Sequence, residues 1–382
     1  MNIFIIARGY PTAKDSTWGC FEKDQAEALA NIGHKITILS VDVRFRWYWR
    51  PLGIQHHTEG LLSIYNIFLI PYIFLFFVPK RLKDWFYTWQ LERIYKRAVI
   101  KHGQPDIIYT HYLYNTHKVI PIHKKYNIPT IAIEHCSQMG YHPIPKTAIQ
   151  LAQQTYPYVD QLLTVSSSLK DNIYKELGFD SIVVPNIVGK EFYYLSPTQT
   201  NNTIKIVSIG RIVQGKRFDL LIQAVNKINI PCELNIIGNG PELHNLQLLI
   251  NKLQAQEKIH LLGNRTKEEI ASILHNSNIF VLPSQSETFG VAYIEALACG
   301  LPIIATDCGG PRDIVTTKNG LLIPVNDMNA LLEAITSLIN NLHSYNRKEI
   351  AEDCQKRFSS QVIANQLGKI FEDTEKKYKE HQ

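Results

Sequence analysis

The chain has 382 residues, of which 45% are hydrophobic and 19% charged, and its formal net charge is +6. This composition is typical of a globular protein and excludes a disordered or fibrous chain, while the length exceeds what one ordinary core fills. We therefore expect two domains of about 150 to 200 residues each, and the modest charge does not make nucleic acid an expected partner.

The six cysteines are scattered, and they form neither a C-x-x-C pair nor the spacing of a zinc site. The first thirty residues lack the basic region and small-residue cleavage site of a secretory signal. We interpret the cysteines as reduced thiols of a cytoplasmic protein, and we expect no metal.

The first half of the chain alternates short β-rich runs with helical patterns, which predicts a parallel sheet with crossover helices. The expected strands are residues 2–6, 35–41, 64–70, 106–111, 130–134, 161–165 and 181–184, and the expected helices include 21–32, 81–101 and 168–177. One doubly wound, Rossmann-like domain over residues 1–188 accounts for this pattern.

Arginines alternate with aromatic residues in residues 44–50, which include Trp47 and Trp49. Such a surface suits a membrane interface or an anionic acceptor, although an ordinary loop with inward-facing aromatic residues also fits. Trp47 and Trp49 are therefore candidate acceptor-side residues. The longest apolar stretch, residues 61–78, contains polar residues and a proline, so we expect a buried strand and an apolar loop there rather than a membrane-spanning helix.

His111 and His135 each end a predicted strand of this domain. A side chain at the carboxyl end of a strand in an open α/β sheet faces the ligand crevice, so we expect a functional role for His135. His111 is either an acceptor-side residue or a structural one. Gly19 ends a loop between the first strand and the first helix, which either closes over phosphates or is a plain connection.

Residues 189–203 lack apolar periodicity and are the expected linker. A second Rossmann-like domain over residues 204–360 should follow, with its ligand at the carboxyl ends of the strands, and residues 361–382 should form a helix that could cross back to the first domain. The expected strands are 204–210, 233–238, 258–262, 279–282 and 302–305, and the expected helices are 217–228, 241–253, 267–275 and 290–299.

The most informative stretch begins at Ser284, where a strand ends, a polar loop carries Glu287, and Gly290 opens a helix. Free backbone NH groups and the partial positive charge at a helix start suit a phosphate. Glu295, further along the helix, could accept hydrogen bonds from ribose hydroxyls, and Glu287 could reach a sugar beyond the phosphates. Each acid alone could be an ordinary surface residue, but the strand-loop-helix context favours binding.

Two cations lie near the start of the second domain: Arg211 follows the strand that ends at Gly210, and Lys216 precedes the next helix. Together they could neutralise a diphosphate leaving group without a metal, although a solvated basic turn is the alternative. Gly238 ends the next strand in a tight turn that fits a nucleobase site.

These residues resemble glycosyltransferase family 4, whose members are retaining nucleotide-sugar enzymes with the GT-B fold, in which two Rossmann-like domains face a central cleft. The resemblance is strongest in residues 210–216, 283–306 and 308–315, and it departs from the family at Trp18-Gly19, where adjacent glycines are frequent. Combined with the residue patterns, it implies the catalytic residues Arg211, Lys216, Glu287 and His135 and the donor-binding residues Gly19, Gly210, Gly238, Thr288, Phe289, Gly290, Val291 and Glu295.

We therefore expect the chain to transfer a sugar from a nucleoside diphosphate to a hydroxyl acceptor with retention, in cell-surface polysaccharide or glycolipid assembly of the bacterial type. The expected partners are a nucleotide sugar and a sugar, polysaccharide or lipid-linked acceptor at the inner face of the cell membrane, with no cofactor. A nucleotide-sugar epimerase or hydrolase of the same fold is one alternative, and a non-catalytic sugar-nucleotide-binding protein is another.

Overall fold

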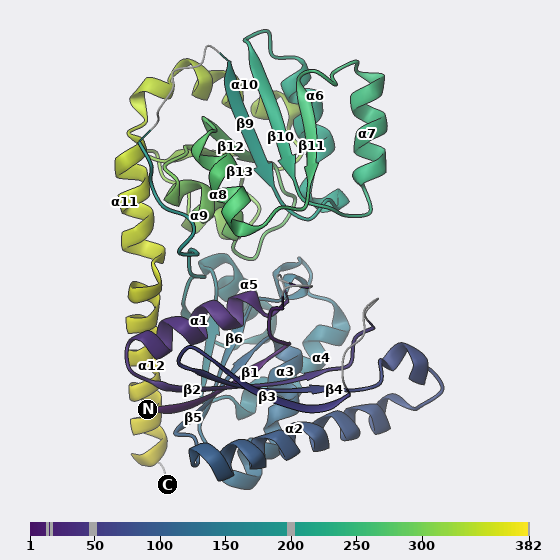
Figure 1. The fold of residues 1–382 in the computed structure, drawn as a ribbon, viewed down its shortest axis with the longest axis vertical. Helices are drawn as coiled ribbons and strands as arrows, with labels where there is room; N and C mark the ends of the chain where they lie inside the picture. Colours follow the sequence, from purple (N-terminus) through teal and green to yellow (C-terminus); the bar gives the residue numbers. More distant parts are fainter. Residues whose placement is uncertain (13–14, 16–17, 46–51, 197–202, 381–382) are drawn as a thin grey trace. The chain divides into compact units, whose positions relative to one another are not determined.

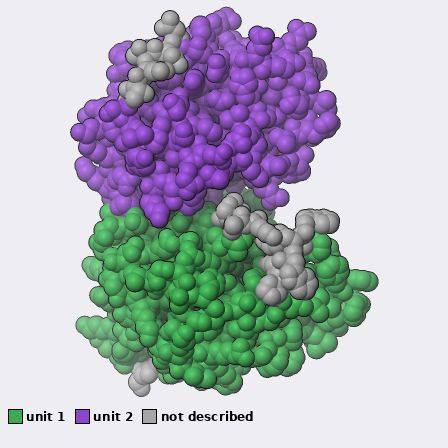
Figure 2. Space-filling model, in the orientation of Figure 1, with its two compact units in different colours: residues 1–165, 169–187, 360–382 green, residues 166–168, 188–359 purple. Residues whose placement is uncertain are grey.

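The computed structural model consists of two compact units, each described here by itself (Figure 2). Unit 1 contains Met1–Val165, Leu169–Ile187 and Ser360–Gln382, and unit 2 contains Ser166–Ser168 and Val188–Ser359. The structure describes the whole chain except residues 13–14, 16–17, 46–51, 197–202 and 381–382. The candidate residues Trp47 and Trp49 lie outside the described residues.

Unit 1 is built on an eight-stranded sheet with the order β3-β4-β2-β1-β5-β6-β7-β8 (Figure 1). All seven strands expected in this half are present: β1 (Asn2–Ala7), β2 (Lys35–Asp42), β4 (Leu62–Phe68), β5 (Ile107–His111), β6 (Thr130–Glu134), β7 (Gln161–Thr164) and β8 (Ile182–Val183). They pair in parallel, and β1 lies between β2 and β5 with Ile3 opposite both Ile36 and Ile107. Apolar residues fill these strands because both faces of the sheet are covered.

Sequence analysis missed one strand of unit 1, β3 (Gly53–Glu59), which pairs antiparallel with β4 at the edge of the sheet. Its sequence is mostly polar and most of its residues are exposed, so no apolar alternation marks it. An edge strand of this kind can be polar because only one of its sides is paired.

Helices cover both faces of the unit 1 sheet. On one face, α2 (Lys80–His102) and α3 (Leu113–Tyr126) share a core with β1 and β2, which includes Phe4, Leu39 and Ile94. On the other face, α1 (Cys20–Asn31) packs beside α12 (Ser360–Glu380) (Figure 1). The ring of Tyr109 in β5 lies 5.0 Å from that of Phe371 in α12. The last helix of the chain therefore completes unit 1. The unit also contains α4 (Lys146–Thr155), most of α5 (Ser167–Leu177), η1 (Tyr72–Leu75), η2 (Ser137–Gly140) and η3 (Tyr156–Tyr158).

Unit 2 contains a six-stranded, wholly parallel sheet with the order β11-β10-β9-β12-β13-β14 (Figure 1). Its strands are β9 (Ile204–Ile209), β10 (Cys232–Ile237), β11 (Ile259–Gly263), β12 (Ile279–Leu282), β13 (Ile303–Thr306) and β14 (Gly320–Ile323). Its helices are α6 (Phe218–Asn226), α7 (Leu243–Lys252), α8 (Lys267–His275), α9 (Val291–Ala298), α10 (Met328–Asn340) and α11 (Arg347–Phe358). Short turns η4 (Gln214–Lys216), η5 (Gly310–Asp313) and η6 (Leu342–Ser344) complete it. Sequence analysis missed β14.

The first residues of the predicted linker are part of the unit 2 fold. The backbone NH of Val188 donates to the carbonyl of Phe358 at 2.9 Å, and Phe192 is buried. Burial of an aromatic ring at this position ties the start of the segment to the unit, so a linker beginning at residue 189 is placed too early.

Candidate functional site

The loops that follow β9, β10 and β12, together with the helix α9 after the last of them, carry the predicted donor residues of unit 2. Gly210 follows β9, Gly238 follows β10, and Glu287 lies in the loop after β12. Because parallel strands point the same way, these loops lie at one edge of the sheet. The structure therefore places the predicted donor residues where an open α/β sheet binds its ligands.

Lys216 and Glu287 form an ion pair across this edge, although 71 residues separate them in the sequence. The side chains are 23% and 11% exposed, respectively, so the pair is partly shielded from water. Ser284 also donates a hydrogen bond to Oε1 of Glu287, at 2.7 Å. The carboxylate of Glu287 is thus held by two donors, one of them charged.

The backbone of Glu287 is fixed by the loop after β13. Its NH donates to the carbonyl of Cys308 at 3.2 Å, and its carbonyl accepts from the NH of Gly310 at 2.8 Å. A Cβ atom on Gly310 would lie 2.4 Å from the Cα of Phe289, so only glycine allows the loops to approach this closely. Sequence analysis identified Glu287 as a site residue. It did not identify Ser284 and Gly310, which hold the side chain and the backbone of Glu287 in place.

Gly290 precedes the first residue of α9 with a φ of 100°, a conformation that favours glycine. Phe289 beside it is buried, with its ring 5.8 Å from that of Phe358, whereas Thr288 and Val291 are half-buried. The first NH groups of a helix have no partner in a preceding turn and carry partial positive charge. Glu295 lies on the same helix and is half-buried.

The turns after β9 and β10 touch backbone to backbone. Gly210 donates its NH to the carbonyl of Ile237 at 3.0 Å, and a Cβ atom on Gly238, whose φ is +139°, would lie 1.9 Å from the carbonyl oxygen of Gly210. A Cβ atom on Gly210 would in turn lie 3.8 Å from Cε of Lys216. The side chain of Arg211 is exposed at the same place. The side chain of Lys216 therefore passes close to the turn at Gly210, and the close approach of that turn to the next one requires the glycine at position 238.

In unit 1, the structure brings His111 and His135 together at the ends of the neighbouring strands β5 and β6. Nδ1 of His111 lies 3.2 Å from Nε2 of His135, and the rings are parallel with centroids 5.2 Å apart. Burial lowers the pKa of His111 to about 3 and the pKa of His135 well below its ordinary value. Both rings are therefore neutral near pH 7, and one donates to the other.

His111 does not lie on the accessible side of this pair. Its side chain is fully buried, and among the described residues its Nε2 atom has no hydrogen-bond partner. The hydrogen bond between the rings joins Nδ1 of His111 to Nε2 of His135, so within the described part of the chain the one polar contact of the buried His111 ring is made to His135. This arrangement fits a residue that positions His135 better than one that contacts an acceptor.

Glu134 fixes the end of β6 from which His135 projects. The buried carboxylate accepts hydrogen bonds from the NH groups of Leu113, His135 and Cys136 at 3.0, 2.9 and 2.7 Å, and from the hydroxyl of Tyr156 at 3.0 Å. Burial raises its pKa, and these hydrogen bonds oppose the rise. Sequence analysis assigned a role to His135 but none to Glu134.

Arg8 and Glu22 form a second charged pair that sequence analysis missed. Nε of Arg8 lies 3.0 Å from Oε1 of the buried Glu22, and the guanidinium lies 3.8 Å from the ring centroid of Tyr112. Gly19 opens α1 beside them with a φ of 83°, and a Cβ atom there would lie 2.2 Å from the carbonyl oxygen of Gly9. The sequence does contain a signal for this pair. Glu22 lies on the apolar face of α1, and a buried ionised side chain normally has a partner of opposite charge.

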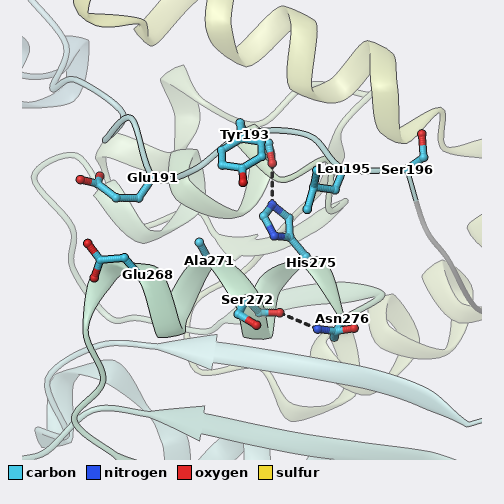
Figure 3. A pocket seen from close by; sticks show the side chains of 9 residues that line it. All are labelled: Glu191, Tyr193, Leu195, Ser196, Glu268, Ala271, Ser272, His275 and Asn276. Carbon is cyan, nitrogen blue, oxygen red and sulfur yellow. Dashed lines mark hydrogen bonds between the residues drawn. The ribbon is translucent and has the colours of Figure 1, made fainter.

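A cavity of about 470 Å³ lies elsewhere in unit 2, between the segment before residue 197 and α8 (Figure 3). Its lining residues are Glu191, Tyr193, Leu195, Ser196, Glu268, Ala271, Ser272, His275 and Asn276. Nε2 of His275 is hydrogen-bonded to the carbonyl of Tyr193 at 2.6 Å. None of the predicted site residues lines this cavity, so the donor residues are not part of it.

Neither a membrane-spanning helix nor a metal-binding cluster occurs among the residues that the structure describes. No helix in that part of the chain is long and apolar enough to cross a membrane. The same residues contain no group of three or more His, Cys, Asp and Glu side chains that could hold a metal ion.

Two family models match consecutive parts of the chain. Residues 23–192 match the model described as Glycosyltransferase Family 4, and residues 196–357 match the model of glycosyl transferases group 1. An uncharacterised glycosyltransferase of Methanocaldococcus jannaschii is 30% identical over 72% of this chain and 78% of its own length.

Two further relatives have more specific descriptions. A putative teichuronic acid biosynthesis glycosyltransferase of Bacillus subtilis is 27% identical over 97% of both chains. A subunit of phosphatidylinositol N-acetylglucosaminyltransferase from Saccharomyces cerevisiae is 26% identical over 84% of this chain and 71% of its own length.

Solved structures share the fold over nearly the whole chain. Sucrose-phosphate synthase from Thermosynechococcus elongatus superposes with a TM-score of 0.80 at 20% identity, covering 97% of this chain and 98% of its own. An Anabaena protein in complex with UDP and glucose superposes with a TM-score of 0.73 at 16% identity, covering 98% of this chain and 100% of its own. At these identities the superpositions establish the architecture alone.

Proposed function

Since the chain belongs to glycosyltransferase family 4 and has the GT-B fold, we propose that it transfers a sugar from a nucleoside diphosphate to an acceptor hydroxyl with retention at the anomeric carbon. The observation that carries this proposal is the pair of Lys216 and Glu287 beside the first turn of α9. This edge of the unit 2 sheet offers a cation, a carboxylate and the NH groups of a helix start, which are the groups that a sugar diphosphate requires.

Each proposed donor residue has a distinct task. Lys216 and Arg211 stabilise the negative charge that develops on the departing diphosphate, and this replaces a metal ion. The NH groups at the start of α9, next to Gly290, bind phosphate oxygens, while Glu295 accepts hydrogen bonds from the ribose. Glu287 accepts hydrogen bonds from hydroxyls of the transferred sugar, and its contact with Lys216 links sugar binding to the leaving group.

In unit 1 we assign His135 to the transferred sugar and His111 to the positioning of His135. Both imidazoles are neutral, so His135 acts as a hydrogen-bonding group and not as a cation. Retention follows if the acceptor attacks the face from which the diphosphate leaves, within an ion pair. The neutral ring adds no positive charge that would oppose the developing oxocarbenium ion.

For the acceptor we propose a polysaccharide or a lipid-linked sugar, used in cell-surface polymer or glycolipid assembly at the inner face of the membrane. The relatives support this proposal, since one is described as acting in teichuronic acid biosynthesis and another as a phosphatidylinositol N-acetylglucosaminyltransferase subunit. A structural neighbour in complex with UDP and glucose makes uridine nucleotides the first donors to examine.

The test is a thermal-shift screen of the full chain against nucleoside diphosphates and their sugars, followed by transfer assays with the donors that bind. A ligand at a hundred times its dissociation constant adds about 2.7 kcal/mol to the free energy of unfolding, which a melting curve resolves. We expect sugar transfer, and an α-linked product from an α-linked donor by NMR. Rapid consumption of donor without acceptor would indicate the epimerase or hydrolase, and binding without turnover across acceptors would indicate a non-catalytic protein.

A further inference from the structure

Helix α2 has two apolar faces, although a surface helix normally has one. The face toward the sheet contains Leu91, Ile94 and Ala98, all of which are buried. Leu82, Trp85 and Trp89 recur at the helical spacing on the opposite side, and they are 56%, 65% and 43% exposed. Nothing in the described part of unit 1 covers this second face.

The segment that leads into α2 extends this exposed surface. Residues of η1 and the turn after it follow β4 directly (Figure 1). Among them, Phe76 and Phe77 are 83% and 71% exposed, and Ile73 and Phe74 are more than half exposed. We call the set of Ile73, Phe74, Phe76, Phe77, Leu82, Trp85 and Trp89 the aromatic surface. Single exposed aromatic side chains are ordinary, but seven large apolar side chains within seventeen residues point to a binding surface.

The rings of the aromatic surface contact one another without becoming buried. The indoles of Trp85 and Trp89 are stacked with centroids 6.3 Å apart, and the rings of Phe76 and Phe77 meet edge to face at 5.7 Å. The guanidinium of Arg93 lies 4.9 Å from the ring centroid of Trp89. These contacts give the surface a defined shape while leaving it open to solvent.

Positive charge surrounds the aromatic surface. Residues 80–102 contain seven Lys and Arg and two acids, a net charge of +5, whereas the whole chain has +6. Both acids are paired with lysines of α3: Asp84 with Lys118 at 2.5 Å, and Glu92 with Lys125 at 2.7 Å. Glu92 also pairs with Lys96 of α2 itself, at 3.1 Å, so seven basic residues of the helix share two acids that α3 also engages.

This combination of groups selects the binding partner. A second copy of the chain would bring two strongly positive surfaces together, which disfavours self-association through this face. The headgroup region of an anionic bilayer accommodates aromatic rings and attracts Lys and Arg at the same time. We propose that the aromatic surface docks unit 1 on membranes that contain anionic phospholipid, with the rings among the headgroups and with Lys80 and Arg81 against the phosphates. The helix then lies parallel to the membrane plane.

The test is flotation of the full chain with vesicles of neutral phosphatidylcholine alone or mixed with phosphatidylglycerol. We expect binding to the mixed vesicles, weaker binding to neutral ones, and weakening by salt. The double variant Phe76→Ser with Phe77→Ser should bind at least about ten-fold more weakly, since burial of one phenylalanine side chain in an apolar environment strengthens binding by at least that factor. Neutralising Lys80→Gln with Arg81→Gln should weaken it roughly five-fold per charge.

The control is Tyr174→Ser on α5, because its side chain is 60% exposed and lies outside the aromatic surface. This variant should float like the wild type. The proposal is overturned if the wild type stays with the soluble fraction in the presence of mixed vesicles, or if the double phenylalanine variant floats unchanged. A wild-type dimer that the same variant dissociates would assign the surface to a second copy and would also overturn it. Thermal shifts with nucleotide sugars, which report the donor site, should be the same in all variants.

Discussion

Removing the side chain of Lys216 should lower turnover strongly and stability weakly. In the structure its ammonium group is paired with Glu287 and lies beside the loop that we assign to the diphosphate. The variant Lys216→Ala therefore removes a cation from the leaving group and leaves the carboxylate of Glu287 with Ser284 as its remaining side-chain donor. Both changes disfavour a transition state in which negative charge accumulates on the diphosphate.

The expected size of the effect follows from the surroundings of the pair. Two unit charges 4 Å apart interact with about 4 kcal/mol at an effective dielectric constant of 20, which sets the scale for one lost contact. Loss of a preorganised charge stabiliser costs about 2.7 to 4 kcal/mol in the barrier, a hundred- to thousand-fold in kcat. Because the pair is partly solvated, its contribution to folding should stay below about 1 kcal/mol.

The measurement is kcat at saturating donor together with the melting temperature without donor. Lys227→Ala is the matched control, since Lys227 is an exposed lysine at the end of α6. The double variant Lys216→Ala with Glu287→Gln should lose less transition-state stabilisation than the sum of the two single variants, because both substitutions break the same ion pair. Full turnover in Lys216→Ala, or a fall in activity explained by a matching fall in melting temperature, would refute the assigned role.

Three other expectations concern the same two units. Gly238→Ala should lower the melting temperature by roughly 5 to 10 °C, because the φ of +139° and the 1.9 Å approach to Gly210 exclude a Cβ atom, whereas Gly215→Ala, which meets open space, should melt like the wild type. With the pKa of His111 held at about 3, the unfolded state binds more protons below pH 6.5, so this residue alone should lower the free energy of unfolding by up to about 1.4 kcal/mol per pH unit as the pH falls from 6.5 toward 3. Urea unfolding of His111→Gln should show a shallower slope over that range, and an unchanged slope would contradict the neutral assignment. Turnover should persist in EDTA if Arg211 and Lys216 replace a metal, and activity that returns only with a divalent cation would show otherwise.

The sequence predicts most of the fold because apolar runs mark strands that are buried on both faces. In unit 1 this signature marks β1, β2, β4, β5, β6 and β7. The missed strand β3 is exposed and mostly polar, so it has no apolar run. The missed strand β14 is apolar and as long as β12 and β13, but it lies at the edge of its sheet and only its first and last residues are buried.

Of the candidate site, the sequence predicts which residues lie at strand ends but not which of them touch. His111 and His135 meet because β5 and β6 are neighbours, with His111 opposite Ile133, and strand order is not legible in a single sequence. The pairing of Arg8 with Glu22 likewise depends on the packing of α1 over the end of β1. Such contacts come from tertiary structure, so residue types alone could not assign them.

The position of α12 determines the order in which the chain can finish folding during translation. Unit 1 contains both the first 165 residues and the final segment Ser360–Gln382, while unit 2 includes the continuous stretch Val188–Ser359 between them. At about 5 to 20 residues per second, the ribosome needs roughly ten to forty seconds to go from residue 188 to the end of the chain. Throughout that time α1 and Tyr109 lack the helix that covers them. Unit 1 is therefore the first to begin synthesis and the last to be complete, because its final helix is made only after unit 2.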